Sequence, residues 1–217
     1  MFKGSTLLGA ATLIASSLLA APAWSAACVQ APVATYTASG FSCNVGGVTF
    51  SNIAVTITTS NGGQVNLNDF FPFIFGNEFG LTLGYSALAQ TPNATADIKW
   101  EYNVSGVPDI NDAFLALAGN TSGSGHAVVS ETLSNGVVLS LNAPGSTTAT
   151  FAPISALHVL KDQIDFVGLT EGFATTSALT NAFSLVPGPV AGAGLPGLVV
   201  ACGGLIGLAR RRRRQIA

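Results

Sequence analysis

The residues that could support hydrolysis are few in this chain. His126 and His158 are its two histidines, and none of its serines lies in a Gly-x-Ser-x-Gly elbow, the turn that exposes a nucleophile in many hydrolases. His126 follows a Gly/Ser-rich stretch, which predicts a solvated strand start. His158 lies between Leu157 and Val159, which is typical of an ordinary strand residue. We therefore expect no enzyme activity.

Metal-ligating side chains are not clustered along the sequence. Structural zinc takes about four Cys or His ligands, whereas the three cysteines and two histidines here are widely spaced. Calcium prefers oxygen ligands, and Asp and Asn are also common turn and capping residues. Neither local group of such residues matches an EF-hand loop, so we expect no metal and no other cofactor. The two groups are Asn66, Asn68 and Asp69, and Asp109, Asn111 and Asp112.

Two cysteines near the start of the chain could form a disulfide. Cys28 and Cys43 would close a loop of about fifteen residues, worth roughly 3 kcal/mol by the chain-entropy model. The alternative is a pair of free thiols, which an oxidising compartment disfavours. Cys202 lies in an apolar stretch near the end of the chain and is expected to be unpaired.

The first 27 residues have the three parts of a secretory signal peptide. Lys3 supplies the positive charge, residues 7–19 form a short apolar segment, and small residues follow. Cleavage after Ala27 fits the small-residue rule, and cleavage after Ser25 is the alternative. Residues 1–27 are therefore predicted to form a signal helix that is removed on export.

The stretch between the two ends is acidic. From residue 28 to residue 185 the basic residues are Lys99 and Lys161, against ten acidic residues, a formal charge of −8. Nucleic-acid binding requires clustered Lys and Arg to neutralise phosphates. This composition therefore argues against a nucleic-acid partner.

Short alternating segments separated by turns predict an all-β body over residues 28–185. Residues 97–105 alternate most clearly, and residues 48–59 alternate with a phase slip at Asn52 that indicates a β-bulge. Asn61-Gly62 and Asn135-Gly136 are typical of tight hairpin turns, while residues 119–125 and 161–163 are expected to be loops. Short strands with Gly, Asn and Pro turns predict an antiparallel β-sandwich, either jelly-roll or Ig-like.

Residues 70–79 form the most aromatic window, FFPFIFGNEF, with five phenylalanines. Pro72 is incompatible with a central strand. We favour a core-plugging loop or edge segment, and the alternative is an exposed aromatic binding surface. A lectin-like function would require exposed aromatics beside Asp or Asn, and Tyr85, Trp100 and Tyr102 are the candidates.

The last 32 residues, 186–217, carry the clearest targeting signal. About twenty apolar or small residues, 190–209, are enough to span the roughly 30 Å hydrocarbon core as a helix. Five arginines, Arg210, Arg211, Arg212, Arg213 and Arg214, follow at once and predict a cytoplasmic C-terminus. The body would then be displayed on the opposite side of the membrane.

This tail resembles that of PEP-CTERM bacterial surface proteins, which exosortases process. The resemblance is carried by Val186, Pro187, Gly188 and Pro189, the apolar span and the terminal arginines, with Gly188 where the family name has Glu. It implies an exosortase-like sorting protease as partner, cleavage near the Pro-x-Pro motif, transient residence in the inner membrane as an anchored precursor, and association with exopolysaccharide. The sequence therefore predicts a non-enzymatic protein of the cell surface or extracellular matrix. The alternative is a carbohydrate-binding, lectin-like module.

Overall fold

The computed structural model describes residues 25–186, and almost all of them lie in strands. Segments rich in Val, Ile, Thr and Phe favour the pleated backbone because branched and aromatic side chains pack well on its two faces. The elements are β1 (Ala26–Ala27), β2 (Ala31–Pro32), α1 (Val33–Tyr36), β3 (Ser42–Val45), β4 (Val48–Ser60), β5 (Gln64–Phe75), β6 (Glu78–Ala89), β7 (Thr95–Leu133), β8 (Val138–Leu141) and β9 (Gly145–Ser184).

The strands form one continuous sheet that folds over into two layers. In the first layer the order is β1, β3, β4, residues 95–105 of β7, residues 156–166 of β9, residues 125–133 of β7, and β8. In the second layer β2, β5 and β6 are followed by residues 172–184 of β9, residues 112–123 of β7 and residues 145–150 of β9. All pairings are antiparallel except that of β1 with β3. The all-β class and the antiparallel sandwich are thus as predicted.

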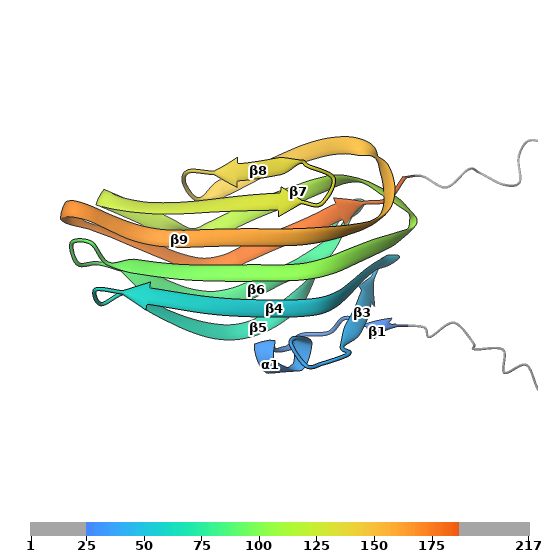
Figure 1. The fold of residues 1–217 in the computed structure, drawn as a ribbon, viewed down its shortest axis with the longest axis horizontal. Coiled ribbons are helices and arrows are strands. Elements are labelled where there is room, and N and C mark those ends of the chain that lie inside the picture. The colour runs from blue at the N-terminus through green and yellow to red at the C-terminus, as the bar shows by residue number, and fades with distance from the viewer. Residues whose placement is uncertain (1–24, 187–217) are drawn as a thin grey trace, which may run out of the picture.

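Strands β7 and β9 connect the layers because each bends and passes through both (Figure 1). In Figure 1 the orange length of β9 lies between the green and yellow lengths of β7. One corner depends on Gly123, whose φ of +60° suits glycine and whose added Cβ would lie 2.5 Å from the Glu171 carbonyl oxygen. The expected loop at 119–125 is therefore wrong: these residues belong to β7 and turn the strand from one layer to the other.

The two Asn-Gly turns have different outcomes. Asn135-Gly136 closes the β7–β8 hairpin, with the Leu133 amide donating to the Val137 carbonyl at 2.9 Å. The turn at Asn61-Gly62 is also tight, but β4 pairs with β3 and β7, whereas β5 pairs with β2 and β6. The predicted hairpin there is wrong, because the turn connects opposite layers of the sandwich.

Of the remaining sequence predictions, one is confirmed, one is wrong and several lie outside the described residues. The bulge in β4 is confirmed: the register shifts between Ser51 and Ala54, and Asn52 has φ +53°. The expected loop at 161–163 is wrong, because β9 continues through it. Most of the expected signal helix, Pro187, Gly188 and Pro189, the membrane span and the arginines lie outside the described residues. Within residues 25–186 no helix is long and apolar enough to cross a membrane.

Candidate functional site

The three aromatic residues expected to form a lectin-like surface lie in the core instead. Trp100 and Tyr102 are fully buried and Tyr85 is 2% exposed. All three point between the layers, where Trp100 and Tyr102 pack with ring centroids 4.9 Å apart. The prediction that these side chains could stack on a sugar is therefore wrong.

The two histidines contact an aromatic ring and polar groups of neighbouring residues. His126 stacks on Phe166 at 4.9 Å, and His158 Nδ1 lies 3.0 Å from Asn103 Oδ1 on the solvent side of the first layer. Beside His158, the Ser134 hydroxyl oxygen accepts from the His158 backbone amide at 3.0 Å. These contacts describe ordinary strand residues.

The acidic clusters have structural partners. The Gln30 amide donates to Asp69 Oδ2 at 2.8 Å, and the Ser184 backbone amide donates to Asp112 Oδ1 at 2.6 Å. Among residues 25–186 no group of three or more His, Cys, Asp or Glu side chains is placed to hold a metal ion. The two clusters thus serve to anchor the strand ends and the N-terminal segment.

Cys28 and Cys43 form a disulfide with their Cα atoms 4.8 Å apart. Cys28 lies just after β1, and its backbone amide donates to the Asn44 carbonyl of β3 at 2.9 Å. Ala26 and Ala27 pair with Cys43 and Asn44 in β1–β3. The bridge therefore attaches the start of the described chain to the edge of the first layer.

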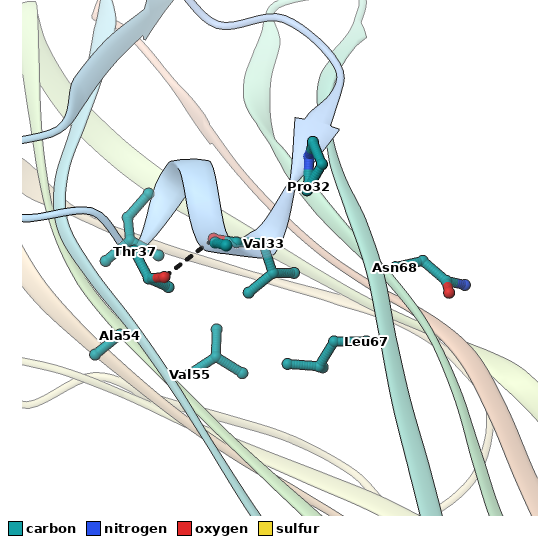
Figure 2. Close-up of a pocket in the computed structure, with 9 residues that line it drawn as sticks. Pro32, Val33, Thr37, Ala54, Val55, Leu67 and Asn68 are labelled. Carbon is teal, nitrogen blue, oxygen red and sulfur yellow. Dashed lines mark hydrogen bonds between the residues drawn. The ribbon is translucent and has the colours of Figure 1, made fainter.

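A cleft of about 600 Å³ lies where α1 covers the open side between β4 and β5 (Figure 2). Val33, Val55 and Leu67 point into it, and Asn68 lies at its rim. The Thr37 hydroxyl at its other side donates to the Val33 carbonyl at 3.1 Å. The lining is mostly aliphatic and contains no ionisable group, so the cleft carries no chemistry of its own.

The central strand of the first layer directs polar side chains into the core. Lys161, Gln163 and Asp165 alternate along β9 and are all fully buried, as are Glu131 of β7 and Asn181 of the second layer. Burial of charged groups is costly unless they are paired and hydrogen-bonded. Their partners therefore define the most unusual chemical environment of the described chain.

Three of these side chains meet around one carboxylate. Glu131 lies directly opposite Lys161 in the β7–β9 register, and the Lys161 ammonium donates to Glu131 Oε2. The other carboxylate oxygen, Oε1, accepts from Asn181 Nδ2 at 3.1 Å. Asn181 Nδ2 also donates to the Phe114 carbonyl at 2.8 Å, and the Tyr102 hydroxyl donates to Asn181 Oδ1.

Aromatic rings enclose this group. The Lys161 Nζ atom lies 5.6 Å from the centroid of Trp100 and 6.0 Å from that of Tyr102. Burial lowers the pKa of Lys161 to about 8, although the Glu131 carboxylate opposes the shift. Burial, together with the nearby Glu131, raises the pKa of Tyr102 well above its ordinary value, so its hydroxyl keeps its proton.

A second buried carboxylate lies further along the same strand. Asp165 accepts from Gln163 Nε2 at 2.9 Å and from the Thr176 hydroxyl at 2.8 Å. Burial raises the pKa of Asp165 to about 6, and the hydrogen bonds from Thr176 and Gln163 oppose the shift. This cluster contains no basic group, in contrast to the one around Lys161.

The outer surface of the second layer also carries aromatic side chains. Phe73 and Phe114 lie in one cross-strand row, separated by Gly80 and Ala182. Because these two residues are small, the rings meet above them, stacked with centroids 5.9 Å apart and 6° between their planes. Phe75 is 75% exposed beside them.

We call Phe71, Phe73, Phe75 and Phe114 the outer aromatic face. The Phe71 ring covers Gly84, where an added Cβ would lie 2.9 Å from it. Phe73, Phe75, Phe114 and Glu78 line a hollow of about 150 Å³. Residues 70–75 are therefore an edge strand with Phe70 in the core, and the alternative of an exposed aromatic surface also applies to this window.

Sequence reasoning missed the buried polar groups. Asn181 shares its alternating face with Leu179 and Phe183, a signal that it points inward. For Lys161 the alternation predicted the wrong face. Leu160 and Ile164 are apolar and lie on the other face of the strand, so that face was expected to be buried. Leu160 is nevertheless 41% exposed and Lys161 is fully buried.

Comparisons with known proteins give only weak similarities. It matches no family model and no curated protein. Among solved structures it is similar to a family two carbohydrate esterase from Cellvibrio japonicus, with 14% identity and TM-score 0.25 over 64% of this chain and 36% of the esterase. The chain thus spans about a third of that enzyme.

Smaller binding modules are similar over more of their length. TmCBM61, solved with beta-1,4-galactotriose, has 6% identity and TM-score 0.28 over 58% of this chain and 86% of the module. The CBM36-1 domain of a xylanase from the hindgut metagenome of Trinervitermes trinervoides has 13% identity and TM-score 0.24 over 61% of this chain and all of the domain. Similarities of this size give no argument about ligand or activity.

Proposed function

We propose that this chain is an exported, non-enzymatic protein of the cell surface or extracellular matrix, with a jelly-roll-like body held or released by its C-terminal signal. One observation carries the proposal. The last strand, β9, ends at Ser184, and the Val186 backbone amide donates to the Asp109 carbonyl at 2.8 Å. Val186 is also the first residue of the predicted processing motif, so this motif begins two residues after the last strand.

The arrangement of the chain ends supports display from one side. The start of the described chain at β1 and the C-terminal end of β9 lie at the same end of the sandwich (Figure 1). A body attached through residues after 186 would therefore project both layers away from its attachment. The Cys28–Cys43 disulfide suits this location, because disulfides persist in oxidising compartments outside the cytoplasm.

The test is the intact mass of the protein recovered from the surface of an exosortase-producing host. We expect a C-terminus near residues 187–189, without the apolar span and arginines. The variant Pro187→Ala/Pro189→Ala should accumulate as uncleaved precursor, while Pro144→Ala, in a loop of the body, serves as matched control. A full-length wild-type C-terminus would make the tail a plain anchor.

A second candidate function, polysaccharide binding, is favoured by the outer aromatic face. Stacked and exposed rings offer an apolar platform to the C–H face of a sugar ring, and exposed apolar patches commonly mark binding sites. Glu78 and Asp112 flank the rings and offer hydrogen-bond acceptors for hydroxyl groups. Because residues 28–185 carry a charge of −8, we propose a neutral exopolysaccharide as the ligand.

A glycan array and affinity electrophoresis with neutral polysaccharides test this candidate. Phe73→Ala/Phe114→Ala should weaken binding at least about tenfold, since about 1.4 kcal/mol corresponds to a factor of ten. Phe173→Ala is the matched control, because Phe173 is an exposed phenylalanine (39%) outside the outer aromatic face. A flat array, or equal loss in the control, would exclude the outer aromatic face as a sugar site.

A further inference from the structure

The buried group around Glu131 brings together an amine, a carboxamide and a carboxylate. Lys161 lies on the central strand of the first layer, and Asn181 lies on the central strand of the second. Glu131 contacts both, with Oε2 on Lys161 Nζ and Oε1 on Asn181 Nδ2. All three side chains are fully buried, so water has no open route to them.

We propose that Lys161 and Asn181 react to form an intramolecular isopeptide bond that crosslinks the two layers. The Lys161 Nζ atom attacks Asn181 Cγ, the Nζ–Cγ bond forms, and the Cγ–Nδ2 bond breaks with release of one ammonia. The Asn181 carbonyl oxygen is retained. No oxidant, reductant or cofactor takes part, because one amide is exchanged for another.

Glu131 is placed to move the protons of this reaction. Its Oε2 takes a proton from the lysine nitrogen, and its Oε1 faces the nitrogen that must leave as ammonia. Starting from the ammonium and carboxylate forms, loss of uncharged ammonia leaves the new amide and a protonated Glu131. Glu131 is therefore the catalytic acid and base, a role typically worth about 10²–10⁴ in rate.

Tyr102 is placed to polarise the carbonyl under attack. Its hydroxyl donates to Asn181 Oδ1, where negative charge develops in the tetrahedral intermediate. The high pKa of Tyr102 keeps this proton available. The Phe114 carbonyl accepts from Nδ2 at 2.8 Å and holds the carboxamide in one orientation.

The core also favours the neutral amine that the attack requires. Burial lowers the pKa of Lys161 to about 8, so a much larger fraction is neutral near pH 7 than for an exposed lysine. Glu131 holds the Lys161 nitrogen on one carboxylate oxygen and the Asn181 carboxamide on the other. Well-oriented intramolecular reactants reach effective molarities of about 10⁵–10⁸ M. Lys99 is the matched contrast, because it is exposed and lies 3.5 Å from Asp162.

Denaturing mass spectrometry of the purified full chain tests the proposal. We expect the wild-type mass to be lower than the sequence mass, corrected for the disulfide, by one ammonia. Asn-Gly sites can lose ammonia through succinimide formation, so the bond must be located by digestion. Cleavage after Glu171 separates residue 161 from residue 181 unless they are linked, and the linked peptide pair is the expected product.

Two variants and a control assign the roles. Glu131→Gln, of nearly the same shape, should form the bond at least about a hundredfold more slowly. Asn181→Asp should give the same linkage with loss of water instead of ammonia. Its measured mass should therefore lie below the variant's own sequence mass by one water. Lys99→Gln should leave the wild-type linkage unchanged.

Three results would overturn the proposal. The first is folded, disulfide-bonded wild-type protein that shows the full sequence mass. The second is ammonia loss that maps to Asn61 or Asn135 with peptides 161 and 181 unlinked. The third is bond formation at the wild-type rate in Glu131→Gln, which would remove the catalytic role of the carboxylate. The first two would leave the buried triad a noncovalent network.

Discussion

The first layer buries charged and polar side chains in its interior, whereas the second layer exposes aromatic side chains on its outer surface. The inward side of β9 carries Lys161, Gln163 and Asp165, all fully buried. The outward side of the second layer carries Phe73, Phe75 and Phe114. Interiors normally favour apolar side chains, and charged groups are seldom fully buried unless they are paired.

The two regions accommodate their unusual side chains in different ways. Around Glu131 each charge has a hydrogen-bonding partner within the core, so the polar groups are tolerated and their positions become strictly defined. The phenylalanines outside are only partly covered by one another and by the small residues Gly80 and Ala182. The proposed buried reaction and the proposed binding surface would each give a reason for one of these departures.

The largest effect should come from breaking the buried pair. Glu131→Leu leaves Lys161 buried without its carboxylate and without the proposed bond to Asn181. We expect a loss of at least about 3–5 kcal/mol in the free energy of unfolding. Glu131→Leu/Lys161→Met should recover part of this loss, because no charge then remains unpaired. Urea denaturation measures both. A loss under about 1 kcal/mol in the single variant would mean that the pair is not buried as described.

The second effect concerns pH. The pKa of Asp165 is raised to about 6 in the folded protein, above its ordinary value of 3.8, so the native state holds this proton more tightly than the unfolded state. Ionisation of Asp165 therefore lowers the free energy of unfolding as the pH rises from about 4 to about 6, by about 2–3 kcal/mol at most.

Asp165→Asn should remove this part of the pH dependence. Thermal or urea unfolding between pH 4 and pH 7 measures it in both proteins. The pKa of Asp97 is also raised to about 6, by burial and by Asp162. The contribution of Asp97 to the pH dependence of the free energy of unfolding should therefore remain in the variant. An unchanged pH profile in Asp165→Asn would assign the whole dependence to Asp97 and other groups.

The smallest effect on stability should come from the outer aromatic face. Phe75 is 75% exposed, and Phe75→Ser should change the free energy of unfolding by no more than about 0.5 kcal/mol. The same substitution should lower the binding of a hydrophobic dye such as ANS, because an exposed apolar patch is reduced. A large loss of stability would place Phe75 in the core and remove the contrast between the two regions.

The predictions that succeeded rest on local backbone chemistry. Alternation over residues 97–105 and the phase slip at Asn52 correspond to a strand and a bulge in the structure, because both depend only on neighbouring residues. The Asn61-Gly62 turn shows the limit of such reasoning. Its local geometry is that of a tight turn, yet β5 pairs with β6 and β2 and not with β4, the strand on the other side of the turn.

The sequence by itself determined that the body of this chain is built of strands with Gly and Asn at tight turns, and that Cys28 and Cys43 could join. It predicted short strands, whereas β7 and β9 run for 39 and 40 residues. Tertiary structure alone decided which face of each strand is buried. Alternation defines two faces of a strand, but residues 157–166 offer a mixed choice, and pairing on both sides fixed Lys161 inward between Trp100 and Glu131. Asn181 reached the same point from the other layer because the bend at residues 167–172 folds β9 back over itself.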